Sequence, residues 1–186
     1  MKVLALSGSL RAGSYNTALA RAASELAPDG IEIEVYDGLG LIPHYDEDLD
    51  QESVETPASV AELRRRIDEA DALLVVTPEY NGSTTGVLKN AIDWVSARHR
   101  GSWLRNKTVA IAGATTGEYG AIWAQQDLRR VLGIAGARVI EGELPVSRAQ
   151  AVFDESGELV DAIVAERLQA HLEALAAASA PLAVAA

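Results

Sequence analysis

The sequence predicts a doubly wound α/β fold built around a parallel sheet. Short apolar runs alternate along the chain with segments in which apolar residues recur at helical spacing. Three of these runs are continuously apolar, which is typical of strands that helices cover on both faces. Strands that alternate with helices form parallel sheets, because right-handed crossovers place the helices on both sides.

Five apolar runs are expected to form the strands. They are Lys2–Leu6, Ile31–Tyr36, Ala72–Thr77, Thr108–Ala112 and Ala137–Glu141. The first, third and fourth are the continuously apolar ones. In the second run, glutamates alternate with isoleucine and valine, as expected of an edge strand with one wetter face.

Five helices are expected to accompany these strands: Asn16–Ala27, Pro57–Ala70, Gly86–Arg98, Tyr119–Leu132 and about Leu159–Ala178. Five strands and five helices favour the flavodoxin-like order 2-1-3-4-5, a three-layer sandwich, over a six-stranded Rossmann sheet. No repeat or linker divides the chain, so residues 1–186 are expected to form one domain with a frayed end at about 179–186. Residues 38–56 form a long acidic connection, a length typical of lids, interface elements or disordered segments.

Composition excludes several classes of protein. The 186 residues are 48% hydrophobic and 23% charged and include no cysteine, which excludes disulfides, thiol catalysis and iron–sulfur ligation. The histidines at 44, 99 and 171 lack metal-ligand spacing, so neither a metal site nor a Ser-His-Asp triad is expected. A net charge of −11 opposes binding to nucleic acid or anionic membranes. With no apolar run of spanning length and no signal peptide, the chain is expected to be cytoplasmic and not inserted in a membrane.

Three unusual loops follow the first, third and fourth strands, and ligands of open parallel sheets bind at the carboxyl ends of strands. The first loop, residues 7–17, reads Ser-Gly-Ser-Leu-Arg-Ala-Gly-Ser-Tyr-Asn-Thr. Its glycines let backbone amides turn toward a ligand, and Arg11 offers a planar fork to phosphate oxygens. Asn16 is expected to cap the helix, whose amino end attracts an anion. A plain capped turn is the alternative, but the arginine and the repeated hydroxyls exceed what a cap requires.

The first loop matches neither of two common nucleotide motifs. It lacks the lysine of an ATP-binding P-loop, and it lacks the Gly-x-Gly-x-x-Gly pattern of a dinucleotide fingerprint. An anionic ligand at this loop therefore belongs to another binding class.

The second and third loops carry weaker signals when each is taken alone. In the second, residues 77–83, Pro78 ends the strand and Asn81-Gly82 predicts a turn. Its backbone can face the edge of a flat heterocycle with Tyr80 as a wall, although a turn with an exposed tyrosine fits equally well. Trp94, in the next helix, is expected to pack rather than to catalyse. The third loop, residues 112–121, is rich in glycine and threonine, which suits close approach to a ligand or merely a flexible connection. Their shared position at one sheet edge favours a binding site.

At these residues the chain resembles the NADPH-dependent FMN reductase family, which includes bacterial quinone, chromate and azo-dye reductases. The resemblance covers residues 2 to about 142. Its most specific segments are Gly8-Ser9-Leu10-Arg11-x-x-Ser14-x-Asn16 and Pro78–Ser83 followed by Gly86–Trp94. It implies a homodimer or homotetramer that holds FMN close to a subunit interface. It also implies NADPH or NADH as co-substrate and a small-molecule acceptor such as a quinone, a flavin, an azo compound or chromate.

The resemblance also implies which residues contact FMN. Those expected to hold the phosphate are Ser9, Arg11, Ser14, Asn16 and Thr17, with Leu10 beside them. Those expected to border the isoalloxazine ring, largely through backbone groups, are Pro78, Glu79, Tyr80, Asn81 and Gly82. The third contact is expected from Thr115, Thr116, Gly117 and Gly120. No catalytic side chain is expected, because hydride passes from nicotinamide C4 to flavin N5.

Two positions depart from the family pattern. Thr85 stands where family members often have proline, and Ala121 stands where they often have a second glycine. The second departure adds a methyl group beside the expected ring position. Neither departure lies in the phosphate loop, so they bear on the choice of substrate rather than on FMN binding.

Two other functions fit the same fold. A flavodoxin-type electron carrier binds FMN without oxidising NAD(P)H, but true flavodoxins usually lack this arginine and wall both ring faces with aromatics, whereas this chain is 5% aromatic. A phosphoacceptor receiver domain needs clustered acidic residues at strand ends, where this chain has Ser7 and Thr77. The predicted function is therefore an FMN-dependent NAD(P)H oxidoreductase, with the electron carrier as the alternative.

Overall fold

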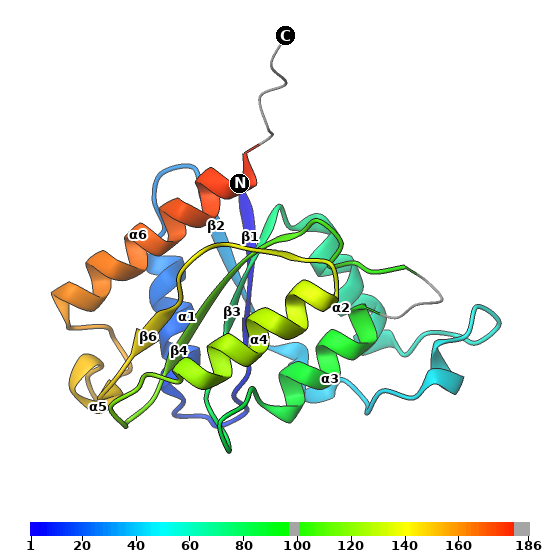
Figure 1. Ribbon diagram of the computed structural model, residues 1–186, viewed down its shortest axis with the longest axis horizontal. Helices are drawn as coiled ribbons and strands as arrows, with labels where there is room; N and C mark the ends of the chain where they lie inside the picture. The colour runs from blue at the N-terminus through cyan, green and yellow to red at the C-terminus, as the bar shows by residue number, and fades with distance from the viewer. Residues whose placement is uncertain (97–100, 181–186) are drawn as a thin grey trace, which may run out of the picture.

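A computed structural model describes residues 1–96 and 101–180 and places one parallel sheet between two layers of helices (Figure 1). The strands are β1 (Lys2–Ser7), β2 (Glu32–Tyr36), β3 (Ala72–Val76), β4 (Thr108–Ala114), β5 (Arg138–Val139) and β6 (Leu144–Val146). The helices are α1 (Tyr15–Glu25), α2 (Ala58–Glu69), α3 (Gly86–Val95), α4 (Ile122–Ile134), α5 (Ala149–Val152) and α6 (Ala162–Ser179). Two short 3₁₀ helices, η1 (Gly38–Leu41) and η2 (Glu47–Asp50), lie in the long acidic connection.

The strand order β2-β1-β3-β4-β5 confirms the predicted flavodoxin-like arrangement. Successive side chains of the central strands point to opposite faces, so each strand contributes to two apolar cores. In β1, Val3 and Ala5 pack with α1 and α6, whereas Leu4 and Leu6 pack with α2 and α3. This two-sided burial is the physical reason for the continuous apolar runs in the sequence.

The predicted fifth strand, Ala137–Glu141, is wrong in extent. Two short strands take its place, and both pair with β4: β5 beside Thr108 and Val109, and β6 beside residues 112–114. Gly142 lies between them with φ of +80°, a left-handed conformation that breaks the extended backbone. Within residues 1–96 and 101–180 the sheet therefore has six strands rather than five.

Several helix boundaries also differ from the prediction. Helix α4 begins at Ile122 rather than Tyr119, because Gly120 and Ala121 both adopt left-handed backbone angles. Helix α6 begins after Asp161, whose carboxylate accepts the N–H of Val164 at 2.9 Å. Helix α3 ends at Val95. Residues 97–98 of its predicted range, and residues 181–186 of the expected frayed end, lie outside the described residues.

The long connection, residues 38–56, is held against α2 and α3. Asn90 accepts the N–H of Tyr45 at 2.8 Å and donates to the carbonyl oxygen of Pro43 at 2.9 Å. The indole N–H of Trp94 donates to the same oxygen at 2.8 Å. Trp94 is otherwise fully buried, which confirms the predicted packing role. Farther along the connection, the buried Asp50 pairs with the buried Arg64 of α2 at 2.7 Å.

No helix in the described ranges is long and apolar enough to cross a bilayer.

Candidate functional site

The three loops singled out in the sequence lie together at the carboxyl edge of the sheet, and hydrogen bonds join them. The hydroxyl of Thr85, just after the second loop, donates to the carbonyl oxygen of Gly8 at 2.8 Å and so joins the first loop to the start of α3. The side chain of Asn16 joins the first loop to the end of β4, where the third loop begins. The carboxylate of Glu79 accepts the N–H of Ala124, which joins the second loop to α4. The site is therefore one cross-linked unit.

Ser14 of the first loop caps the amino end of α1, so the prediction that Asn16 caps this helix is wrong. The hydroxyl of Ser14 accepts the N–H groups of Asn16 and Thr17 at 3.2 and 3.4 Å. The buried carboxamide of Asn16 instead points across the sheet to Ala114. It donates to the carbonyl oxygen of Ala114 and accepts its N–H, both at 2.9 Å. Asn16 thus fixes the spacing between two loops that are 98 residues apart in sequence.

Arg11 folds back over its own loop. Its guanidinium carbon lies 5.8 Å from the ring centre of Tyr15, a distance at which a cation is attracted to an aromatic face. A Cβ on Gly13 would lie 3.3 Å from the Arg11 guanidinium, which places the cation directly above the turn. Arg11 makes no ion pair among the residues that the structure describes. Its charge is therefore available at the amino end of α1.

A cavity of about 360 Å³ opens beside this loop. Its lining residues are Ser7, Ser9, Leu10, Arg11, Ala12, Thr17, Arg21, Val35, Tyr36, Asp37 and Leu39. The hydroxyls of Ser7 and Thr17 lie 2.9 Å apart within it. Two arginines face one aspartate here, so the balance of charge in the cavity is positive although the whole chain is acidic.

The second loop is a tight hairpin. Tyr80 and Ser83 exchange backbone hydrogen bonds of 3.1 and 3.2 Å, and the residues between them, Asn81 and Gly82, have φ of +55° and +73°. This is the Asn-Gly turn that the sequence predicts. Tyr80 is exposed at its tip, while Pro78 is buried at its base.

Two side-chain contacts hold this hairpin against α4. In one, the carboxylate of Glu79 accepts the N–H of Ala124 at 3.1 Å. Ala124 lies in the first turn of α4, where the helix dipole favours a negative charge. The other is the hydroxyl of Ser83, which donates to Asp127 at 2.5 Å. This hydrogen bond, with the neighbouring Arg130, lowers the pKa of the Asp127 carboxyl. Asp127 is therefore ionised at neutral pH and keeps both contacts.

The third loop is shaped by a close approach at Gly120. A Cβ there would lie 2.6 Å from the backbone nitrogen of Val146, and φ is +58°, so only glycine fits. The fully buried Gln125 donates to the carbonyl oxygen of Gly120 at 2.8 Å. Ala121 follows with φ of +60°, a conformation strained for alanine. The family's second glycine would adopt it without strain, so the departure at Ala121 has a backbone cost.

All three loops carry backbone N–H groups that donate no hydrogen bond within the described ranges. They include the N–H groups of residues 12–15, 81–82 and 116–119. The first set lies at the amino end of the eleven-residue α1 beneath Arg11, where an anion is stabilised. The other two sets belong to the second and third loops. Free donors of this kind suit a phosphate at one end and the polar edge of a flat heterocycle at the other, which is the chemistry of FMN.

Sequence reasoning missed several residues of this edge. Trp123, in the first turn of α4, is 48% exposed beside the 65% exposed Tyr119. Ser83, Asp127 and Gln125 brace the loops, but their spacing in sequence carries no motif that signals it. Trp123 had a usable signal, because it lies close after the third loop at the start of a helix. Neither a His nor a carboxylate cluster that could ligate a metal occurs in residues 1–96 and 101–180.

Comparison with known proteins identifies the family. A family model described as NADPH-dependent FMN reductase matches residues 1–151. The chain belongs to the NADPH-dependent FMN reductase family. It is 44% identical over 176 residues to an NAD(P)H-dependent FMN reductase of Pseudomonas aeruginosa, covering 94% of this chain and 93% of that one. A quinone reductase of Escherichia coli is 38% identical, with the same coverage.

A solved structure agrees with this family assignment. The flavoenzyme FerB of Paracoccus denitrificans, an NAD(P)H:(acceptor) oxidoreductase, superposes with a TM-score of 0.85 at 32% identity, covering 96% of each chain. As a member of this reductase family, the chain is an FMN-dependent oxidoreductase that uses NAD(P)H. The predicted function, an enzyme, is therefore confirmed in preference to the alternative, a flavodoxin-type electron carrier.

Replacing Asn16 tests the bridge between the first and third loops. In Asn16→Ala, the buried N–H and carbonyl of Ala114 lose their partner, and each unsatisfied group costs about 1–3 kcal/mol. Because two groups lose their partner, we expect the free energy of unfolding, measured by urea titration, to fall by more than the cost of one such group. Gln126→Ala, at an exposed site on α4, should stay within about 0.5 kcal/mol of the wild type. Equal stability of the two variants would contradict the assigned bridge.

Proposed function

We propose that the three loops bind FMN with its phosphate at the amino end of α1 and its ring between the second and third loops. The observation that supports this most strongly is the set of free backbone donors at residues 12–15, 81–82 and 116–119. The phosphate residues are Ser9, Leu10, Arg11, Ser14, Asn16 and Thr17. The ring residues are Pro78, Glu79, Tyr80, Asn81, Gly82, Thr115, Thr116, Gly117 and Gly120.

Within this set, the residues act in different ways. Arg11 neutralises phosphate charge from above the turn, and Ser9 and Thr17 offer hydroxyls. Asn16 acts as a positioning residue, because both ends of its carboxamide are used by Ala114. Glu79 and Ser83 hold the hairpin, so that Asn81 and Gly82 present backbone groups at a fixed place. Donors fixed in advance stabilise developing negative charge without reorganisation.

FMN, when bound, supplies the chemistry, since it takes hydride from NAD(P)H and delivers two electrons to the acceptor. We propose a quinone-type acceptor, which the name of the Escherichia coli relative supports. A quinone takes up one hydride equivalent and one proton from solvent and leaves as the hydroquinone. No side chain of the site has to carry that proton, since the carboxyl edge is open to water. The cytoplasmic location stays a prediction.

An anaerobic absorbance record tests the function. The purified protein is loaded with FMN and its visible bands are followed before and after NADPH is added. We expect rapid bleaching, followed by recovery of the bands when 1,4-naphthoquinone is injected. A yellow protein that neither NADPH nor NADH bleaches would be an electron carrier, and a protein that retains no FMN would refute the site.

Arg11→Ala tests the phosphate end. Losing a charge-assisted contact costs roughly 1.5–3 kcal/mol, or about ten- to more than a hundredfold in affinity for FMN. The measurement is a fluorescence titration of apoprotein with FMN. Arg65→Ala removes the same charge from an exposed site on α2, where Arg65 pairs with Glu62 and Glu69, and should bind FMN normally. Equal affinities in the two variants would show that Arg11 is not a phosphate ligand.

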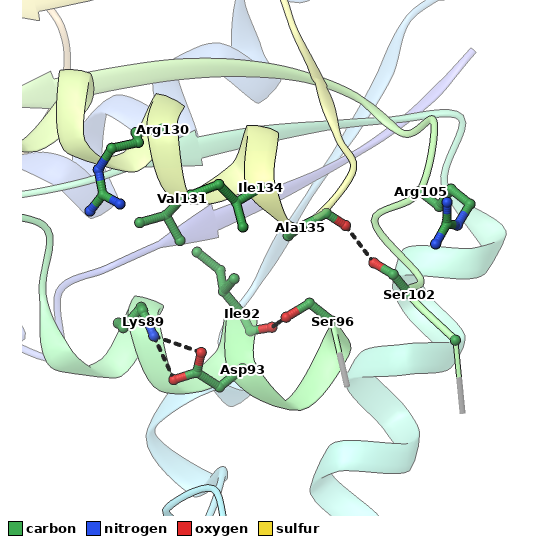
Figure 2. A pocket seen from close by; sticks show the side chains of 11 residues that line it. Lys89, Ile92, Asp93, Ser96, Ser102, Arg105, Arg130, Val131, Ile134 and Ala135 are labelled. Atoms are coloured by element: carbon green, nitrogen blue, oxygen red, sulfur yellow. Dashed lines mark hydrogen bonds and ion pairs between the residues drawn. The ribbon is translucent and has the colours of Figure 1, made fainter. Parts of the chain in front are cut away.

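We propose that the protein is a homo-oligomer that associates through the groove between α3 and α4 (Figure 2). The groove has a volume of about 530 Å³ and an apolar floor of Ile92, Val131 and Ile134. Ile134 is 77% exposed, which is unusual for a large aliphatic side chain. The rim carries both signs of charge, with Lys89 paired to Asp93 on α3 and Arg130 on α4. A twofold contact can match such a rim to itself.

Ile134→Asp is expected to dissociate the oligomer, because it places a charge on the apolar floor. Sedimentation velocity gives the mass of the particle in solution. Ile163→Asp makes the same change at a similarly exposed position on α6, 70% accessible, and should sediment like the wild type. A monomeric wild type, or an oligomer that survives Ile134→Asp, would rule out this face.

A further inference from the structure

Tyr119 and Trp123 form an aromatic pair that stands in solvent at the rim of the site. Their ring centres are 4.8 Å apart and their planes are inclined by 54°. Neither ring belongs to the two apolar cores. By contrast, Trp94 is fully buried and Trp103 stacks on Arg64 at 4.3 Å. The protein therefore leaves one tryptophan exposed beside its cofactor loops without a structural role in the described residues.

The pair is fixed at the place where an electron acceptor must arrive. Tyr119 belongs to the third loop, and Trp123 directly precedes Ala124, whose N–H is held by Glu79 of the second loop at 3.1 Å. The pair is thus attached to both loops proposed to border the flavin ring. Tyr80, 60% exposed at the tip of the hairpin, adds a third aromatic to the same edge.

The charges around the pair decide which kind of acceptor it suits. Arg148 is bound to Glu118 at 2.9 Å, and Arg130 to Asp127 at 2.8 Å. Glu79 is satisfied by the amino end of α4. Arg148 and Arg130 are thus each paired with a carboxylate, and the surface that Tyr119 and Trp123 themselves present carries no charge.

The size of the pair suits a small molecule rather than a protein. An aromatic side chain offers about 150–250 Å² of surface in all, and only part of each ring is exposed. Stable protein interfaces need roughly 800 Å² from each partner. One planar ring of a ligand, stacked on the pair, matches the available area.

We propose that Tyr119 and Trp123 are specificity-determining residues. They stack on the planar ring of an uncharged acceptor of the quinone type and offer no ionic contact to an oxyanion. This inference rests on the proposed function, because the acceptor is useful there only if FMN binds between the second and third loops. It adds the side chains that select this class of acceptor and the discrimination against oxyanions.

Binding of 1,4-naphthoquinone to the oxidised, FMN-loaded protein tests the proposal without turnover. The chain has no cysteine for the quinone to alkylate. We expect saturable binding by calorimetry together with quenching of tryptophan fluorescence. Trp123→Ala should weaken binding about five- to tenfold, the loss of one aromatic contact of about 1–1.4 kcal/mol. Trp123→Phe should keep the affinity within about twofold of the wild type, while the quenching disappears. Chromate should neither bind at this place nor displace the quinone.

The outcomes separate the two levels of inference. A wild type that holds no FMN, or is not bleached by NADPH, overturns the proposed function and the acceptor surface with it. A wild type that is bleached but binds naphthoquinone no better than Trp123→Ala does overturns the acceptor surface alone. Chromate that displaces the quinone overturns the discrimination against oxyanions. An equal loss in Trp123→Phe and Trp123→Ala would show that the indole, rather than a stacking ring, is what matters, and would also overturn the proposal.

Discussion

The site depends on one buried carboxamide, that of Asn16. Loops that bind a ligand through backbone groups must be held at fixed distances, because the backbone offers no long side chain to make up an error. Asn16 uses its donor and its acceptor on the same residue, Ala114, and so ties the start of α1 to the end of β4. Two further hydrogen bonds, from Thr85 to Gly8 and from Ala124 to Glu79, complete the set of links that hold the loops in place. With the spacing fixed, the N–H groups of the three loops hold set positions and are proposed to meet the ligand.

This set of links explains why the site needs so few functional side chains. FMN carries its own reactive atoms, so the protein has to supply placement, a place for phosphate charge and an open face. In the proposed mode of binding, the helix end and Arg11 provide the positive charge in a chain whose net charge is −11. The absence of cysteine and the scattered histidines agree with chemistry that resides in the cofactor rather than in a nucleophile or a proton relay.

The sequence predicted those parts of the fold that local physics determines. Continuous apolar runs predicted β1, β3 and β4 because both faces of these strands are buried, and Asn81-Gly82 predicted the hairpin because few residues adopt its backbone angles. Long-range choices escaped prediction. Nothing in the sequence near Asn16 shows that its partner is 98 residues away. Its position at the start of a helix therefore predicts a cap, although the side chain that caps α1 is that of Ser14. The split of the fifth strand at Gly142 and the late start of α4 likewise depend on positive φ angles that pattern alone does not reveal.

The divided strand has a consequence for the solution behaviour of the protein. A long, flat strand at the edge of a sheet offers a row of unpaired backbone groups on which a second chain can grow. Here one margin of the sheet is only β5 and β6, two and three residues long, with Gly142 between them and Pro145 inside β6. The other margin, β2, carries the exposed carboxylates of Glu32 and Glu34. Neither margin of the sheet thus offers the long, uncharged edge on which a second chain could extend it into a fibre.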